Sequence, residues 1–166
     1  GVTVATVDEQ EVPSIDWERL QDKGLYDIRF LTTGEFACPD TDMCLCAQKR
    51  GDCIALLDHP KEMSTSATEV ADIRAYFEAL VSAQSGSYAA AFTPWFKSAN
   101  KALLTTTAED DGVIEIPAAF GYLFAFANSL VYYPEWFAVA GSYRGVITEL
   151  KDVLREYTSA ECEILQ

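Results

Sequence analysis

Four cysteines near the start of the chain are the first residues whose type could do chemistry. The sequence holds five in all: Cys38, Cys44, Cys46, Cys53 and Cys162. The first four lack the paired C-x2–4-C spacing of a zinc site. Cys44 and Cys46 fall on a predicted helix, where side chains two positions apart do not share a face. An odd number in a chain of this length does not indicate a disulfide framework. We interpret them as reduced, buried thiols and predict no metal or cofactor.

His59 is the only histidine, so a Ser-His-Asp triad would need it as the base. Its neighbour Asp58 would be a poor orienting acid, because adjacent residues on a strand point to opposite faces. No G-x-S-x-G elbow is present either. We therefore expect His59 to be a strand-end or loop residue, and we predict no catalytic residues. The enzymatic alternative, an α/β hydrolase-like protein, would require Cys53 or Ser142 close to His59.

The acidic run Glu109-Asp110-Asp111 could in principle hold a hard cation. An EF-hand loop needs alternating ligands and a distant Glu, and these three acids are contiguous. A solvated turn is the simpler interpretation. The phosphate-binding patterns G-x-x-x-x-G-K-[ST] and G-x-G-x-x-G are absent from the sequence.

A dense aromatic group lies near the end of the chain, in a region that we expect to be a loop. Its members are Tyr132, Tyr133, Trp136, Phe137 and Tyr143. Packing in the core is one interpretation. A contact between subunits is the other, because aromatic residues are enriched at interface cores.

Composition narrows the class of protein. The chain has 166 residues, 49% of them apolar, which suits one folded domain with a sizeable core. Its net charge is −14. Such a surface repels phosphate backbones and anionic membranes, so we predict no nucleic-acid partner and no membrane insertion. The sequence begins with Gly1 and not Met, which leads us to expect a fragment or processed product with truncated termini.

The first half of the chain alternates between predicted strands and helices. Strands are expected at Val2–Val7, Tyr26–Thr32, Cys53–Leu57 and Tyr88–Phe92 from their apolar and β-branched runs. Pro13 and Ser14 should open a short helix over Ile15–Lys23 that Gly24 ends. A second helix is expected over Thr41–Arg50. A third follows the capping-box spacing of Ser66 and Glu69, with apolar residues at helical intervals from Val70 to Val81.

The second half is predicted to begin with Pro94–Ala99 as a loop or edge. A hairpin should join Ala102–Thr107 to Val113–Ile116 through the acidic turn. Pro117–Val131 is apolar on nearly every face and predicts a central, buried helix. A last amphipathic helix is expected from Val146 to Tyr157, and a final strand over Cys162–Leu165.

This order predicts an α/β fold in which a largely parallel sheet is flanked by helices and carries a β-hairpin insertion. We expect one domain over residues 1–166.

Four stretches together resemble the tail sheath proteins of contractile phages and related particles. They are Trp17–Thr32, Asp52–Pro60 (DCIALLDHP), Ala89–Lys97 (AAAFTPWFK) and Ile114–Arg144. Within Ile114–Arg144, Pro117 begins a helix that is rich in small residues. Trp136 and a short turn follow that helix, as in the family. The chain departs from the family pattern at Ala118, Asn128–Ser129 and Val139.

The resemblance implies a sheath-type core domain similar to subtilisin in topology but without its catalytic apparatus. It implies a structural subunit that forms hexameric rings with copies of itself, stacked into a helical sleeve around a tail tube. Contraction of that sleeve would drive the tube through a target envelope. The implied partners are the tail tube, baseplate and tail terminator proteins. The implied location is the virion, with the host cytoplasm during assembly.

Overall fold

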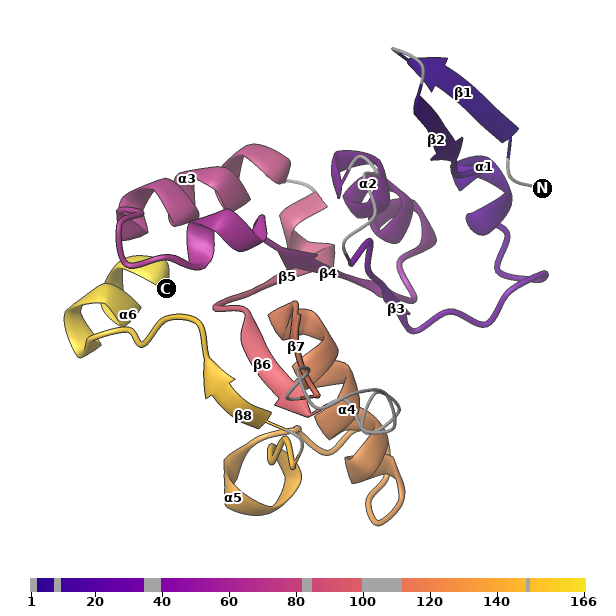
Figure 1. Ribbon diagram of the computed structural model, residues 1–166. Helices are drawn as coiled ribbons and strands as arrows, with labels where there is room; N and C mark the ends of the chain where they lie inside the picture. Colours follow the sequence, from indigo (N-terminus) through magenta and orange to yellow (C-terminus); the bar gives the residue numbers. More distant parts are fainter. Residues whose placement is uncertain (1–2, 8–9, 35–39, 82–84, 100–111, 149) are drawn as a thin grey trace. The chain divides into compact units, whose positions relative to one another are not determined.

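The computed structural model describes residues 3–7, 10–34, 40–81, 85–99, 112–148 and 150–166 (Figure 1). These residues form a mixed α/β protein, as the sequence predicts at this coarser level. The chain divides into two compact units, which are described separately. The first comprises residues 1–57 and 71–91, and the second comprises residues 58–70 and 92–166.

The first unit begins with an antiparallel ribbon of β1 (Thr3–Val7) and β2 (Gln10–Ser14). The predicted first strand is confirmed, but Pro13 and Ser14 belong to β2 and do not open a helix. Helix α1 (Trp17–Leu20) starts later, because the Asp16 carboxylate caps it by accepting a hydrogen bond from the Arg19 backbone N–H at 3.0 Å.

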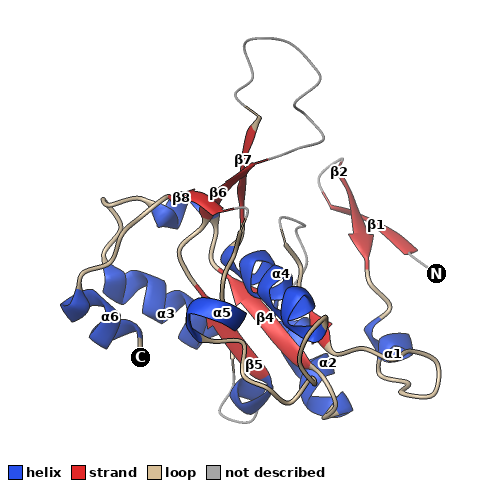
Figure 2. Cartoon of the chain, turned by 90° about the horizontal axis from the view of Figure 1, so that it is seen from below, coloured by secondary structure: helices blue, strands red, loops and turns tan. Residues whose placement is uncertain are grey.

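A three-stranded parallel sheet follows, in the order β3-β4-β5; its strands β4 and β5 are labelled in Figure 2. Its strands are β3 (Phe30–Leu31), β4 (Ile54–Asp58) and β5 (Ala89–Phe92). Helix α2 (Asp40–Arg50) connects β3 to β4, and α3 (Val70–Leu80) lies on the connection from β4 to β5. Short 3-10 turns cover Lys61–Ser64 and Ser85–Tyr88. Helices α2 and α3 and strands β4 and β5 match their predicted ranges to within one residue, whereas β3 is much shorter than the predicted strand Tyr26–Thr32. Helix α3 begins at Val70, which leaves no capping role for Ser66.

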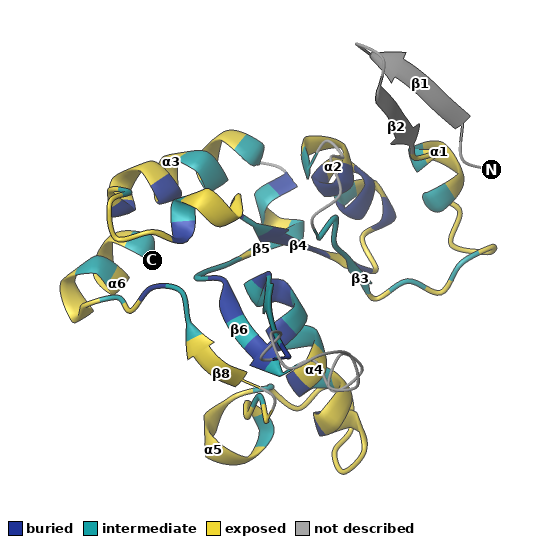
Figure 3. Cartoon of the chain, viewed as in Figure 1, coloured by how far each residue is buried: buried dark blue, intermediate teal, exposed yellow. Residues whose placement is uncertain are grey.

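The core of the first unit lies between α2 and β4 (Figure 3). Its fully buried members are small or apolar: Met43, Cys44, Ala47, Cys53, Ala55 and Leu57. Partly buried side chains pack against them, among them Trp17 of α1, Phe77 of α3 and Tyr88, which directly precedes β5. Burial of this apolar surface is the main stabilising contribution here.

The second unit contains an antiparallel sheet in the order β7-β6-β8. Its strands are β6 (Phe96–Ala99), β7 (Val113–Ile116) and β8 (Leu150–Val153). The prediction of Pro94–Ala99 as a loop or edge is wrong, because β6 is the middle strand and pairs on both sides. The predicted strand at Val113–Ile116 is confirmed, and it pairs with β6. Ala102–Thr107 lies outside the described residues.

Three helices complete the second unit: α4 (Ala118–Leu130), α5 (Gly141–Arg144) and α6 (Ser159–Leu165). Helix α4 confirms the predicted helix, but burial on every face is wrong, since Phe124 and Leu130 are each 47% exposed. The helix buries only its small-residue face: Ala119, Gly121, Ala125 and Ser129.

Two predictions at the end of the chain are wrong. Val146–Tyr157 is not a helix, because Leu150–Val153 pairs with β6 as β8. Cys162–Leu165 is not a strand, because it lies in α6. A capping box starts that helix: Thr158 accepts from the Glu161 backbone N–H, and the Glu161 carboxylate accepts from the Thr158 N–H.

Candidate functional site

The cysteines of the first unit are structural side chains in the part of the chain described. Cys44 and Cys46 lie on α2, Cys53 precedes β4, and all three are buried free thiols. Burial, with the nearby Asp40 carboxylate, raises the pKa of Cys44 to about 11. A thiol with a pKa this high stays protonated at neutral pH, and it is therefore a weak nucleophile and a weak metal ligand. Within the described residues no three His, Cys, Asp or Glu side chains gather as a metal site. Cys38 and Glu109-Asp110-Asp111 lie outside them.

His59 follows the last residue of β4, as expected, and is buried, with 1% of its surface exposed. Its backbone is held by Trp95, whose indole N–H donates to the His59 carbonyl at 2.7 Å. The Trp95 backbone N–H in turn donates to the Ser64 hydroxyl at 3.2 Å. Trp95 therefore fixes the backbone of His59, and Ser64 fixes the backbone of Trp95.

The imidazole of His59 is one end of a chain of short polar contacts. Nδ1 lies 2.8 Å from the Pro60 carbonyl oxygen, and Nε2 lies 2.6 Å from Thr93 Oγ1. Thr93 Oγ1 lies 2.7 Å from the Tyr157 hydroxyl. We refer to His59, Thr93 and Tyr157 as the hydroxyl–imidazole cluster.

The Pro60 carbonyl fixes the direction of these hydrogen bonds. A carbonyl oxygen only accepts, so Nδ1 carries the imidazole proton and donates it to Pro60. In the neutral ring Nε2 is then the acceptor, and the Thr93 hydroxyl donates to it. Because the single hydroxyl proton of Thr93 is used there, the Tyr157 hydroxyl donates to Thr93 Oγ1.

Burial keeps the imidazole in this neutral form. Desolvation is the largest cause that lowers the pKa of His59 below its usual value, and the Arg155 charge lowers it further. The hydrogen bond to the Pro60 carbonyl raises the pKa of His59, but by less than burial lowers it. Nε2 of His59 is therefore an unprotonated base at neutral pH.

Arg155 holds the Tyr157 end of the hydroxyl–imidazole cluster. Its guanidinium lies 4.9 Å from the centroid of the Tyr157 ring. It also donates to the backbone carbonyls of Thr65 and Thr68, at 3.0 and 2.6 Å, and to the Glu161 carboxylate at 2.7 Å. The hydrogen bond from the Thr158 backbone N–H, followed by that from Arg155, lowers the pKa of Glu161 to about 2. The segment after β8 is thus anchored by polar contacts.

Thr93 also lines a cavity of about 310 Å³ in the second unit. The other walls come from β6, α4 and the segment before β8, with Phe96, Tyr122 and Ile147 among them. Gly121 permits this close approach, because a Cβ there would lie 2.8 Å from Ile147 Cδ1 and 2.9 Å from Phe96 Cε1. The residues that line the cavity are mainly apolar, and Thr93 is among them.

Sequence reasoning looked for a serine or cysteine beside His59 and overlooked Thr93. The hydroxyl that contacts Nε2 belongs to Thr93, whereas Ser142 is exposed on α5. One signal could have found the pair. His59 follows β4 and Thr93 follows β5, and polar residues after neighbouring parallel strands meet at the carboxyl edge of a sheet.

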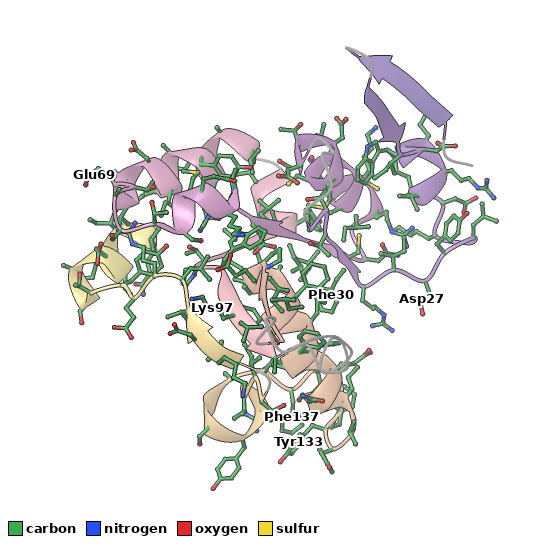
Figure 4. All side chains as sticks on the ribbon, viewed as in Figure 1. Asp27, Phe30, Glu69, Lys97, Tyr133 and Phe137 are labelled. Carbon is green, nitrogen blue, oxygen red and sulfur yellow. The ribbon has the colours of Figure 1, made fainter. Side chains whose placement is uncertain are left out.

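The aromatic residues after α4 are at the surface of the chain and not in its core (Figures 3 and 4). The exposed fractions of Tyr132, Trp136 and Tyr143 are 82%, 79% and 90%. Tyr133 and Phe137 are less exposed, and their ring centroids lie 5.8 Å apart. We refer to these five residues as the aromatic surface. The prediction that they pack in the core is wrong for this chain, which leaves the subunit contact as the other interpretation.

Arg144 orders part of the aromatic surface. Its guanidinium lies 5.5 Å from the ring centroids of both Tyr133 and Phe137. Its Nε donates to the Ala138 carbonyl at 2.9 Å. Cation–π contacts of this kind hold the two rings in a defined orientation.

Comparison with known proteins adds no relative: no family model, no curated protein and no solved structure matches the chain. Among the described residues, no helix combines the length and apolar character needed to cross a bilayer.

Proposed function

We propose that the chain is the core of a contractile tail sheath subunit, a structural protein that assembles with copies of itself around a tail tube. The observation that carries the proposal is the exposed aromatic surface. Tyr132, Trp136 and Tyr143, which follow one another within twelve positions of the sequence, are each about four-fifths exposed or more. Contiguous exposed apolar patches commonly mark interaction sites.

The composition of the aromatic surface fits a protein interface. Tyr, Trp, Phe and Arg are the residues enriched in the centres of such contacts, and they dominate their energetics. Arg144 holds Tyr133 and Phe137 in place before any partner binds. This order reduces the entropy that association would cost.

The acidic charge constrains how the copies meet. Each chain carries a net charge of −14, so two copies repel one another at low ionic strength. Assembly through apolar rings is compatible with this charge, because at 0.1 M salt the repulsion between exposed charges more than about 10 Å apart is largely screened. The proposed partners, besides further copies, are the tail tube, baseplate and tail terminator proteins.

The proposed mechanism is mechanical. A sheath-type core of subtilisin-like topology would move as a rigid body while the contacts between subunits repack from an extended to a contracted lattice. Folded cores must survive that movement. The buried interior of each compact unit is consistent with this requirement.

The test is assembly of the full-length protein, followed by negative-stain electron microscopy and analytical ultracentrifugation. We expect the native protein to form sleeves or stacked rings. The triple variant Tyr132→Ser, Trp136→Ser, Tyr143→Ser should keep its circular dichroism spectrum but stay monomeric. A matched control, Leu25→Ser with Ile164→Ser, removes exposed apolar side chains elsewhere and should assemble as the native protein does.

Two results would overturn the proposal. One is a native protein that remains a monodisperse globule at every concentration and occurs in no particle. The other is a triple variant that assembles as readily as the native protein.

A further inference from the structure

We propose that Thr93 and His59 form an acyl-transfer site, in which the Thr93 hydroxyl attacks short apolar carboxylic esters bound in the adjoining cavity. This activity is separate from the proposed assembly role and does not depend on it. The geometry is that of an activated nucleophile: a hydroxyl in short contact with a base, and a base oriented by a third group. Thr93 Oγ1 lies 2.6 Å from His59 Nε2, and the Pro60 carbonyl holds Nδ1 at 2.8 Å.

The direction of each hydrogen bond favours attack by Thr93. Its proton already points to Nε2, the atom that must receive it. A hydroxyl oxygen has two acceptor positions, and Tyr157 uses one of them at 2.7 Å. Among the described residues, His59 and Tyr157 are the two partners of Thr93 Oγ1, so its second acceptor position is left for a bound molecule. Thr93 is also one of the residues that line the cavity where a substrate would bind.

The cavity defines the class of substrate. Its volume of about 310 Å³ is at the lower end of the range for small-molecule sites, which begins near 300 Å³. The walls that Phe96, Tyr122 and Ile147 contribute are apolar. A short, uncharged acyl group of a few carbons fits that volume and chemistry. The acidic surface of the chain would disfavour anionic esters.

The reaction balances with water as the only co-reactant. Thr93 Oγ1 forms a bond to the acyl carbon, and its proton moves to His59 Nε2. The bond between the acyl carbon and the ester oxygen then breaks, and the leaving alcohol takes the proton from Nε2. Water next attacks the acyl-threonine and gives a proton to Nε2. Release of the carboxylic acid returns that proton to Thr93 Oγ1.

Tyr157 is a positioning residue in this proposal. Its hydroxyl donates to Thr93 Oγ1, and the Arg155 guanidinium lies over its ring. Its loss leaves the nucleophile and base in place but removes one contact that orients the hydroxyl. We therefore expect Tyr157→Phe to lower kcat several-fold with KM unchanged.

The experiment measures hydrolysis of p-nitrophenyl butyrate by the full chain at pH 7.5. All proteins carry Cys162→Ala, because the exposed Cys162 thiol could react with an activated ester by itself. Thr93→Val keeps the branched shape and removes the hydroxyl, and we expect it to lose on the order of 100-fold or more in kcat/KM. Thr93→Ser retains the hydroxyl and should keep measurable activity. Peptide mass spectrometry of rapidly quenched samples should place the butyryl group on residue 93.

The proposal is overturned if the Cys162→Ala protein hydrolyses the ester no faster than unfolded chain. It is also overturned if Thr93→Val retains full activity, or if the butyryl group is found only on lysines. The folding of each variant is checked by circular dichroism. Because Thr93→Ser is the milder change, its activity separates loss of chemistry from loss of fold. None of these outcomes bears on sleeve assembly.

Discussion

The two compact units are stabilised by different kinds of buried side chains. In the first, the described buried residues are mostly apolar, and they gather around α2 and β4. In the second, buried polar residues are as prominent as apolar ones: His59, Ser64, Ser98, Ser129 and Arg155. The first unit therefore relies mainly on apolar packing around one buried cation, Arg50, which donates to the Leu20 and Tyr26 carbonyls, whereas buried polar residues make up a larger share of the second unit.

The largest effect should come from the apolar core of the first unit. Leu57→Ala removes a side chain that is 2% exposed and leaves a cavity beside α2. We expect the free energy of unfolding to fall by about 3 kcal/mol, as for other buried Leu-to-Ala changes. Urea denaturation at pH 7 measures this loss. Leu25→Ala, at a side chain that is 61% exposed, is the control and should change stability by less than about 0.5 kcal/mol. Equal losses in the two variants would contradict the comparison.

The polar counterpart in the second unit is Arg155. Arg155→Met keeps the length of the side chain but removes the donor from the Thr65 and Thr68 carbonyls and one of the donors from the Glu161 carboxylate, which still accepts from Thr158. We expect a loss of roughly 2 kcal/mol, because a hydrogen bond that involves a charged group contributes about 1.5–3 kcal/mol and water replaces part of what is lost at the exposed Thr65.

The matched control for Arg155 is Arg74→Met. Arg74 pairs with Glu78 at 2.8 Å, but both side chains are half-exposed or more. Such surface pairs contribute about 0.5 kcal/mol or less. If the two Arg-to-Met changes destabilise equally under the same urea titration, buried polar contacts are not what holds the second unit.

The same contrast explains which elements could be predicted. In the first unit, local signals locate the elements: Lys49, Arg50 and Gly51 mark the end of α2, a continuous apolar run gives β4, and helical spacing of apolar residues gives α3. In the second unit, Val146–Tyr157 has apolar spacing compatible with a helix, yet β8 forms there because it pairs with β6. In such a short segment, pairing with a neighbouring strand outweighs the local spacing of apolar residues.

The candidate sites were predictable to different degrees. The capping box at Thr158 and Glu161 is a local signal in the sequence that marks the start of α6. The contact between His59 and Thr93 joins residues 34 positions apart and needs the fold. Exposure of the aromatic surface also could not be predicted, since aromatic residues are common both in cores and at interfaces.

A smaller effect is expected where the second unit relies on close packing. Gly121→Ala places a Cβ 2.8 Å from Ile147 Cδ1 and 2.9 Å from Phe96 Cε1. Overpacking costs about 1–3 kcal/mol, and the better helix propensity of Ala offsets up to about 1 kcal/mol. We therefore expect a net loss of about 1 kcal/mol in thermal or urea denaturation.

Two further variants test this explanation of Gly121. Gly86→Ala is the control, because its Cβ would meet only ordinary contacts, at 3.8 Å or more, with Val81. The double variant Gly121→Ala, Ile147→Val removes the methyl group that clashes and should recover part of the loss. The double variant could instead be less stable than Gly121→Ala alone, by more than an Ile-to-Val change usually costs. That result would contradict a clash with Ile147.

The last and smallest effect is the pH dependence that His59 gives to the second unit. Burial lowers the folded-state pKa of His59 below 6.5, so the unfolded chain binds a proton first as the pH falls. The stability that neutral His59 contributes is complete above pH 6.5 and is lost as the pH falls through its folded-state pKa. Glu161, whose pKa is lowered from 4.5 to about 2, acts in the same direction but in a more acidic window. Between pH 7 and 5.5 the decline should therefore belong to His59, the only histidine in the sequence. Urea midpoints across that interval measure it, and His59→Gln should flatten the curve. An equally steep curve in His59→Gln would assign the decline to other groups and would remove the argument that burial keeps the imidazole neutral.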